Sequence, residues 1–117
     1  MGEFQRDTEI TPVLFRKCGP RRGGEVIALF PAELGTYELH TCSSYVRVGQ
    51  HGSASIAGPD SVIHFTRRAT PVEYADLQKE LEGSPFGYRL KVYQRITRQH
   101  DDARKAQYRA LHAGMKG

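Results

Sequence analysis

The chain has 117 residues, a net charge of +4 and two cysteines, Cys18 and Cys42. This length suits a single domain, and no apolar run approaches the ~20 residues that a membrane-spanning helix needs. Two cysteines are too few for a disulfide framework or a zinc module, and the charged residues 1–10 do not form a signal peptide. We therefore expect a cytoplasmic protein with free thiols that binds no metal ion or other cofactor.

The first half of the chain is typical of β-structure. Residues 1–11 are polar and predict a flexible N-terminus. Segments 13–15 and 25–30 predict two strands, and the glycine-containing turn between them predicts a hairpin. Pro31 is expected to close the second strand, and residues 31–41 to form an irregular connection. Segments 43–49 and 61–67 predict two further strands, and the glycine-rich residues 49–59 predict a loop between them.

The clearest element is a helix over residues 71–82. Thr70 is a capping residue, Pro71 suits the first helical position, and Glu73 stands where a capping box needs a carboxylate. Apolar residues follow at helical spacing, and Gly83 ends the pattern. We expect this helix to pack across one face of a sheet.

The last third combines a strand and a second helix. Residues 88–96 alternate, with Tyr88, Leu90 and Val92 on one face and basic residues on the other. Residues 98–113 suit a helix, in which Asp101 and Lys105 have the spacing of an ion pair. Its apolar stripe is thin, so we expect a marginal helix that gains little from packing and is ordered only against a partner.

The predicted order β-β-β-β-α-β-α indicates an α+β fold. We expect a small single domain with a mainly antiparallel sheet of four to five strands, one packed helix and a marginal C-terminal helix. The corresponding segments are a flexible N-terminus over 1–11, the α+β domain over 12–97 and a basic C-terminal helix or tail over 98–117.

Positive charge is concentrated near the end of the chain. Residues 87–117 hold eight basic and two acidic residues, a net charge of +6, so residues 1–86 carry −2. Cations beside an aromatic ring suit a phosphate backbone with a stacked base; a solvated surface and an acidic partner protein are the alternatives. An alternative for the Arg67–Arg68 pair is pairing with Glu73 or Asp76. The candidate binding residues are Arg67, Arg68, Arg89, Lys91, Tyr93, Arg95, Arg98, Arg104, Lys105 and Arg109.

A second candidate is a ligand-binding loop formed by Gly49, Gln50, His51, Gly52 and Ser53. Glycines let a backbone approach a ligand closely, and the polar side chains supply donors and acceptors. The segment lacks the lysine of a phosphate-binding P-loop. A hairpin loop whose glycines need positive φ is the alternative explanation.

No motif names a reaction. His64-Phe65-Thr66 resembles half of the signature of two-histidine phosphoesterases, but that family needs a second copy, and His40-Thr41-Cys42 departs from it. We therefore predict a non-catalytic protein that contacts nucleic acid, a DNA or an RNA. The alternatives are a protein–protein interaction module that docks on an acidic partner, and self-association as a homodimer through the C-terminal helix or a sheet edge.

Overall fold

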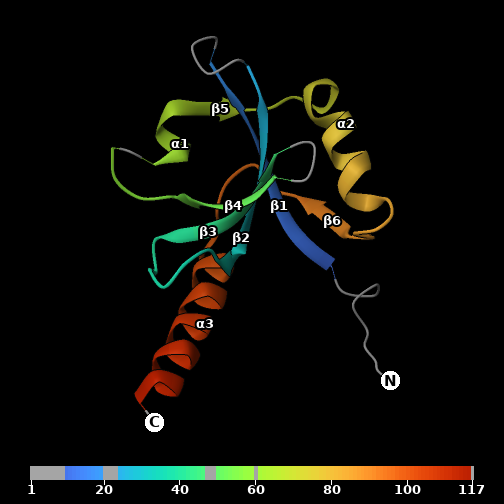
Figure 1. Ribbon diagram of the computed structural model, residues 1–117. Helices are drawn as coiled ribbons and strands as arrows, with labels where there is room; N and C mark the ends of the chain where they lie inside the picture. Colours follow the sequence, from blue (N-terminus) through green and yellow to red (C-terminus); the bar gives the residue numbers. More distant parts are fainter. Residues whose placement is uncertain (1–9, 20–23, 47–49, 60, 117) are drawn as a thin grey trace.

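The structure, a computed structural model, describes residues 10–19, 24–46, 50–59 and 61–116. Within these residues the elements (Figure 1) follow in the order β1 (Ile10–Cys18), β2 (Val26–Leu34), β3 (Thr41–Val46), β4 (Gln50–Ser55), α1 (Val62–Phe65), β5 (Thr66–Arg68), α2 (Pro71–Glu82), β6 (Arg89–Val92) and α3 (Arg98–Lys116). They form a small α+β domain, so the predicted fold class is confirmed.

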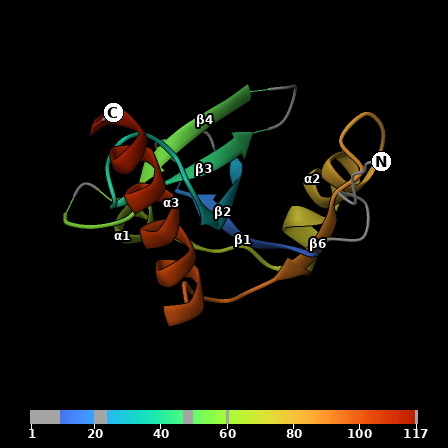
Figure 2. The same cartoon turned by 90° about the horizontal axis from the view of Figure 1, so that it is seen from below.

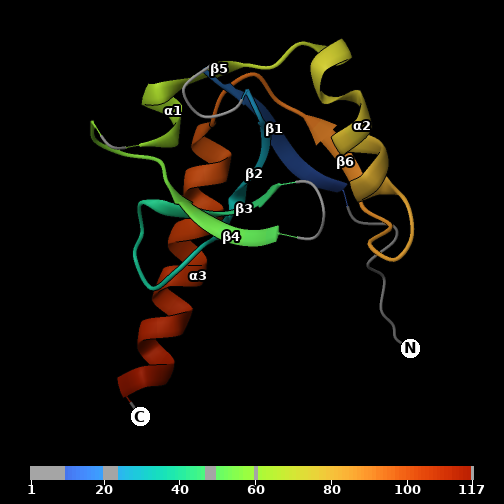
Figure 3. The same cartoon turned by 45° about the horizontal axis from the view of Figure 1, so that its top comes forward.

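One sheet of six strands organises the domain, with β1 at its centre. Strands follow the order β4-β3-β2-β1-β5 with antiparallel neighbours, and β6 pairs with β1 in parallel. One edge of β1 carries β2, so the predicted hairpin is confirmed. The other edge is divided, because residues 16–18 pair with β5 and residues 10–13 pair with β6 (Figure 3). The mainly antiparallel sheet is as predicted, with one strand more than expected.

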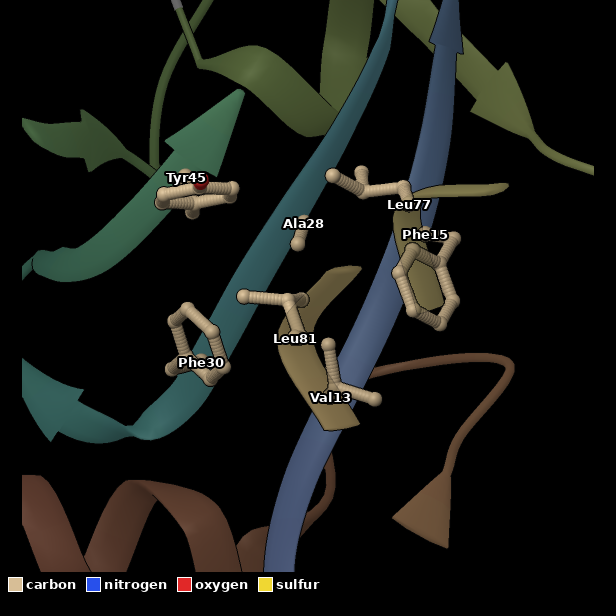
Figure 4. Packing of buried hydrophobic residues seen from close by; sticks show 7 residues of the cluster. All are labelled: Val13, Phe15, Ala28, Phe30, Tyr45, Leu77 and Leu81. Atoms are coloured by element: carbon tan, nitrogen blue, oxygen red, sulfur yellow. The ribbon is translucent and has the colours of Figure 1, made fainter. Parts of the chain in front are cut away.

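Alternation along the strands gives the sheet two apolar faces. On one face α2 covers a buried cluster (Figure 4), whose members are Val13, Phe15, Ala28, Phe30, Tyr45, Leu77 and Leu81. The intervening residues of β1 and β2 belong to a second cluster, formed by Leu14, Leu29, Cys42 and Val62. Figure 2 shows α2 and α3 on opposite sides of β1 and β2. The sheet is therefore the middle layer of the domain.

Helix α2 has the predicted bounds and the predicted cap. The Thr70 hydroxyl accepts from the backbone N–H of Glu73, and the Glu73 carboxylate accepts from the backbone N–H of Thr70 at 2.8 Å. This capping box pairs two backbone donors that the first helical turn would otherwise leave without partners. Leu77 and Leu81 then reach the core, with at most 1% of either residue exposed.

Strand β2 does not end at Pro31 as predicted but continues to Leu34, and α3 bonds to its last residues. The pairing of β2 with β3 shifts register between Phe30 and Leu34. The Arg104 guanidinium donates to the Pro31 carbonyl at 2.8 Å. The Gln107 amide donates to the Ala32 carbonyl at 2.7 Å and accepts from the Leu34 N–H at 2.8 Å. Polar groups that the register shift frees thus find partners on α3.

The C-terminal helix is therefore docked on the sheet, so the expectation that it gains little from packing is wrong. Polar side chains of α3 bond to β2 where its pairing with β3 shifts register. The apolar residues of the helix give no sign of these contacts. His100 and Arg104 are 3% and 4% exposed. Asp101 pairs with Arg104 rather than with Lys105. The C-terminal turns of α3 extend beyond the sheet (Figure 1).

Other boundaries also differ from prediction. Segment 61–67 is not a strand: the Ser61 hydroxyl accepts from the N–H of His64 and caps the single turn of α1, and β5 follows it. Segment 49–59 is not all loop, because Gln50–Ser55 forms edge strand β4 along the whole of β3. Ile10 and Thr11, expected in a flexible terminus, belong to β1, and residues 1–9 lie outside the described part. Among the described helices, none is long and apolar enough to span a membrane.

Candidate anion-binding groove

Two arginines face each other across the pairing of β1 with β5. Arg16 and Arg68 are directly opposed Cα partners. Side chains at such positions leave the sheet on the same face, with Cβ atoms about 5 Å apart, and like charges there are destabilising. Arg16 follows Leu14 in the alternation of β1, so this pair lies on the face of the second cluster. An anion between the two guanidinium groups would relieve such a contact.

Hydrogen bonds to residues of α1 and β5 fix the position of the Arg16 guanidinium. Its Nε donates to the Thr66 hydroxyl at 2.9 Å, and its Nη2 donates to the carbonyls of Ile63 and Thr66 at 3.0 and 2.6 Å. Among the described residues, none accepts a hydrogen bond from Nη1. The residue is only 9% exposed, so its guanidinium is bonded mainly to polar groups of the protein rather than to water.

The chain after β6 completes a groove beside this pair. Gln94 and Arg95 come alongside Arg16 and Arg68, and the space between them has a volume of about 370 Å³. We call this site the basic groove; its lining residues are Leu14, Arg16, Ile56, Ile63, Arg68, Gln94, Arg95 and Ile96. It therefore combines three guanidinium groups with an apolar wall of leucine and isoleucine.

The described lining of the basic groove carries positive charge without a carboxylate. Burial and, secondly, the neighbouring charge of Arg68 lower the pKa of Arg16 from its ordinary value. An arginine stays protonated in proteins, so this direction means that the cation is poorly solvated. The side chains of Arg68 and Arg95 make no hydrogen bond or ion pair with any other described residue. A bound anion would supply the negative charge and the hydrogen-bond acceptors that these side chains lack in the groove.

Tyr93 does not offer the stacking surface expected of it. Its half-buried ring packs against the second cluster. The ring of His100 stands edge-on to it, with 4.5 Å between the ring centroids, and the Lys91 Nζ lies 5.3 Å from the Tyr93 ring centroid. These contacts take up part of the ring surface that a stacked base would need. Lys91 itself is exposed beside it.

The other predicted cations separate into two groups. Arg67 is on the opposite face of β5 and pairs with Glu73 at 2.9 and 2.6 Å, which is the alternative foreseen for it. Arg104, a residue of α3, is buried and donates to the Pro31 carbonyl of β2, so the prediction that it belongs to the binding surface is wrong. The remaining residues are exposed on β6 and α3: Arg89, Arg98, Lys105 and Arg109.

The predicted ligand loop takes another form. Gly49 and the side chain of Gln50 lie outside the described part, and His51, Gly52 and Ser53 are paired residues of β4. Gly52 has no positive φ, so the hairpin-loop alternative does not apply at Gly52, and Gly49 is outside the residues that test it. The His51 ring lies 4.8 Å from that of Tyr45 and 5.5 Å from that of Phe86, between centroids. This histidine is thus part of an aromatic group.

The thiols and histidines do not assemble into a reactive centre. Cys18 and Cys42 are buried and unbridged, and burial raises the pKa of the Cys42 thiol to about 11, which disfavours the reactive thiolate. Among the described residues, no group of three or more metal-binding side chains is close enough to hold an ion. Comparison with protein-family models, curated proteins and solved structures gives no match.

Proposed function

We propose that this protein is a non-catalytic binding protein that contacts nucleic acid through the basic groove and the cations beside it. One observation carries the proposal: Arg68 and Arg95, which lie on different elements, line one groove with Arg16. Nucleic acids present a regular row of phosphates, and most protein contacts to them come from arginine and lysine side chains. Unpaired guanidinium groups that converge on one groove suit this partner better than scattered surface charge does.

The surroundings of the groove extend the same surface. Lys91 is exposed on β6, two residues before Tyr93, and Arg98 is exposed at the first position of α3. Both are near in sequence to Arg95. The apolar wall of the groove, rather than the half-buried ring of Tyr93, offers the place for a base. A single strand suits such a wall because its bases are not stacked inside a duplex.

The test is the salt dependence of oligonucleotide binding. Fluorescence anisotropy with a labelled single-stranded DNA and an RNA of the same sequence measures affinity from about 50 mM salt upwards. Each phosphate contact contributes about 0.7 to the slope of log affinity against log salt for single strands. We expect Arg95→Gln to weaken binding and to reduce the slope by about this amount.

The matched control is Lys79→Gln. Lys79 is an exposed cation of α2, on the other face of the sheet, and its replacement changes the net charge equally. No binding of either oligonucleotide at about 50 mM salt would end the proposal. Equal losses in the two variants would show that net charge alone attracts the nucleic acid.

A protein–protein module is the second candidate, and the outer face of α3 is the observation that favours it. Arg98, Lys105 and Arg109 are exposed there, at spacings that bring them to one side of the helix. An acidic partner protein would complement this stripe. Lys105→Glu with Arg109→Glu should abolish such an interaction while leaving oligonucleotide binding at the groove largely intact. Removing residues 98–117 is less informative, because that deletion also removes the side chains bonded to β2.

A further inference from the structure

The geometry points to the basic groove as a binding site for a phosphomonoester group carried on a small apolar or planar body. This inference goes beyond nucleic-acid contact, because it names a discrete ligand that can bind without any polymer. It rests on the number of guanidinium groups, on their fixed positions and on the size and wall of the groove.

The number of guanidinium groups selects the anion. Arg16, Arg68 and Arg95 come from β1, β5 and the segment after β6, so they approach from separate elements. A phosphomonoester has three terminal oxygens and carries a charge of about −1.5 to −2 at neutral pH. A phosphodiester has two such oxygens and a single charge, and a carboxylate has two oxygens in one plane. Of these three groups, only the monoester can give each guanidinium an oxygen of its own, and its charge is the largest.

The fixed position of Arg16 suits a specific site. Three hydrogen bonds to Ile63 and Thr66 hold its guanidinium before any ligand arrives. The Thr66 hydroxyl is held in turn, because it donates to the Val62 carbonyl. Little side-chain entropy remains to be lost at Arg16 when an anion binds, and such preorganisation favours affinity. Arg68 and Arg95 are exposed and can close on the anion from the solvent side.

The size and wall of the groove define the rest of the ligand. A volume of about 370 Å³ is near the lower end of the range for small-molecule sites. The space therefore suits one phosphate with one ring or comparable body. Leu14, Ile56, Ile63 and Ile96 line it on the apolar side. Free organic phosphates and the phosphorylated end of an oligonucleotide share this chemistry.

Phenyl phosphate is the probe, because it joins a monoester to an apolar ring. Isothermal titration calorimetry measures its binding to the full chain and to two variants, Arg68→Gln and Arg95→Gln. A hydrogen bond to a charged group is worth enough to predict about a tenfold loss of affinity in each variant. The control is Arg67→Gln, which removes the same charge from the adjacent residue on the opposite face of β5. Arg16 is left unchanged, because its replacement would release α1.

The outcomes separate the inference from its rivals. Saturable binding that weakens in R68Q and R95Q but not in R67Q supports it. No saturable binding at millimolar phenyl phosphate to chains that are folded by circular dichroism overturns it. So does an equal loss in R67Q, or equally tight binding of methyl phenyl phosphate, the corresponding diester.

Oligonucleotides then identify the source of the phosphate. Tighter binding of a 5′-phosphorylated oligonucleotide than of its 5′-hydroxyl counterpart supports recognition of a nucleic-acid end. Binding of phenyl phosphate without that preference supports a free organic phosphate as the ligand. If no oligonucleotide binds while phenyl phosphate does, the proposed function fails and this inference stands.

Discussion

Replacing Arg104 by alanine should destabilise the fold, because this residue is part of the structure rather than of the binding surface. Its guanidinium donates to the Pro31 carbonyl at 2.8 Å and pairs with Asp101. Arg104 is 4% exposed, and Pro31 is among the most completely buried residues. The substitution therefore leaves a buried carbonyl without its donor and removes the packing of a long side chain.

The structure sets the size of the effect. An unsatisfied buried acceptor costs about 1–3 kcal/mol. The ion pair adds little, since 45% of the Asp101 side chain is exposed and water can solvate the carboxylate that remains. We expect a loss of about 2 kcal/mol in the free energy of unfolding. A domain of this kind is stabilised by about 5–15 kcal/mol in total, so the variant should still fold.

Urea unfolding followed by far-ultraviolet circular dichroism measures the change. Lys105→Ala is the matched control, because Lys105 is the next residue of α3 and is exposed; its cost should stay within about 0.5 kcal/mol. The urea midpoint of Arg104→Ala should fall without a change in the slope. Equal stability of the two variants would refute the role of Arg104 in docking α3 on β2.

Three further predictions concern the core, the helix cap and a thiol. Leu81→Ala should cost about 3 kcal/mol in urea unfolding, because it opens a cavity beneath α2, whereas Val72→Ala, at a residue 88% exposed, should cost little. The Arg67 side chain and the backbone of Thr70 lower the pKa of Glu73 from 4.5 to about 2. Because the folded value is the lower one, its stabilisation is present above pH 4.5 and is lost as the pH falls toward 2; Glu73→Gln should remove that part of the acid dependence of unfolding. Burial of Cys42 and its raised pKa predict that it reacts with a thiol reagent at neutral pH only as fast as the chain opens, and rapid labelling of the folded protein would contradict this.

Local signals explain what the sequence predicts well. The capping residues of α2 act within one turn, so Thr70, Pro71 and Glu73 suffice to place the helix. Alternation likewise places Leu90 and Val92 toward the core of the first face. The prediction of a strand over 61–67 fails because this segment is bonded to Arg16, which is 47 and 50 residues away in the sequence from its two partners. Ser61, which caps α1, is the local signal for the helical turn within the segment, but the contacts with Arg16 are not visible in it.

The groove itself combines predicted and unpredicted residues for the same reason. Arg95 is a candidate because residues 87–117 carry a net charge of +6, and Arg68 because it stands in the Arg67–Arg68 pair, but nothing in the charge pattern singles out their neighbour Arg16. Only the pairing of β1 with β5 opposes Arg16 to Arg68. Within 13–18 a signal does exist: both faces of β1 are apolar at Val13, Leu14 and Phe15, and Arg16 continues the face of Leu14. A cation at a core position is a sign of either a buried partner or a ligand.

The segment that carries α2 begins and ends on the divided edge of β1, beside the basic groove. Val13 accepts from the N–H of Tyr93 at 2.8 Å, and Phe15 accepts from the N–H of Ala69 at 2.9 Å, so the chain leaves β1 and returns to it at neighbouring positions. Between these two anchor points lies the segment that carries α2. A ligand that contacts both Arg68 and Arg95 would link the two ends of this segment. The amide hydrogen exchange of α2, on the far side of the sheet, would then report whether the groove is occupied.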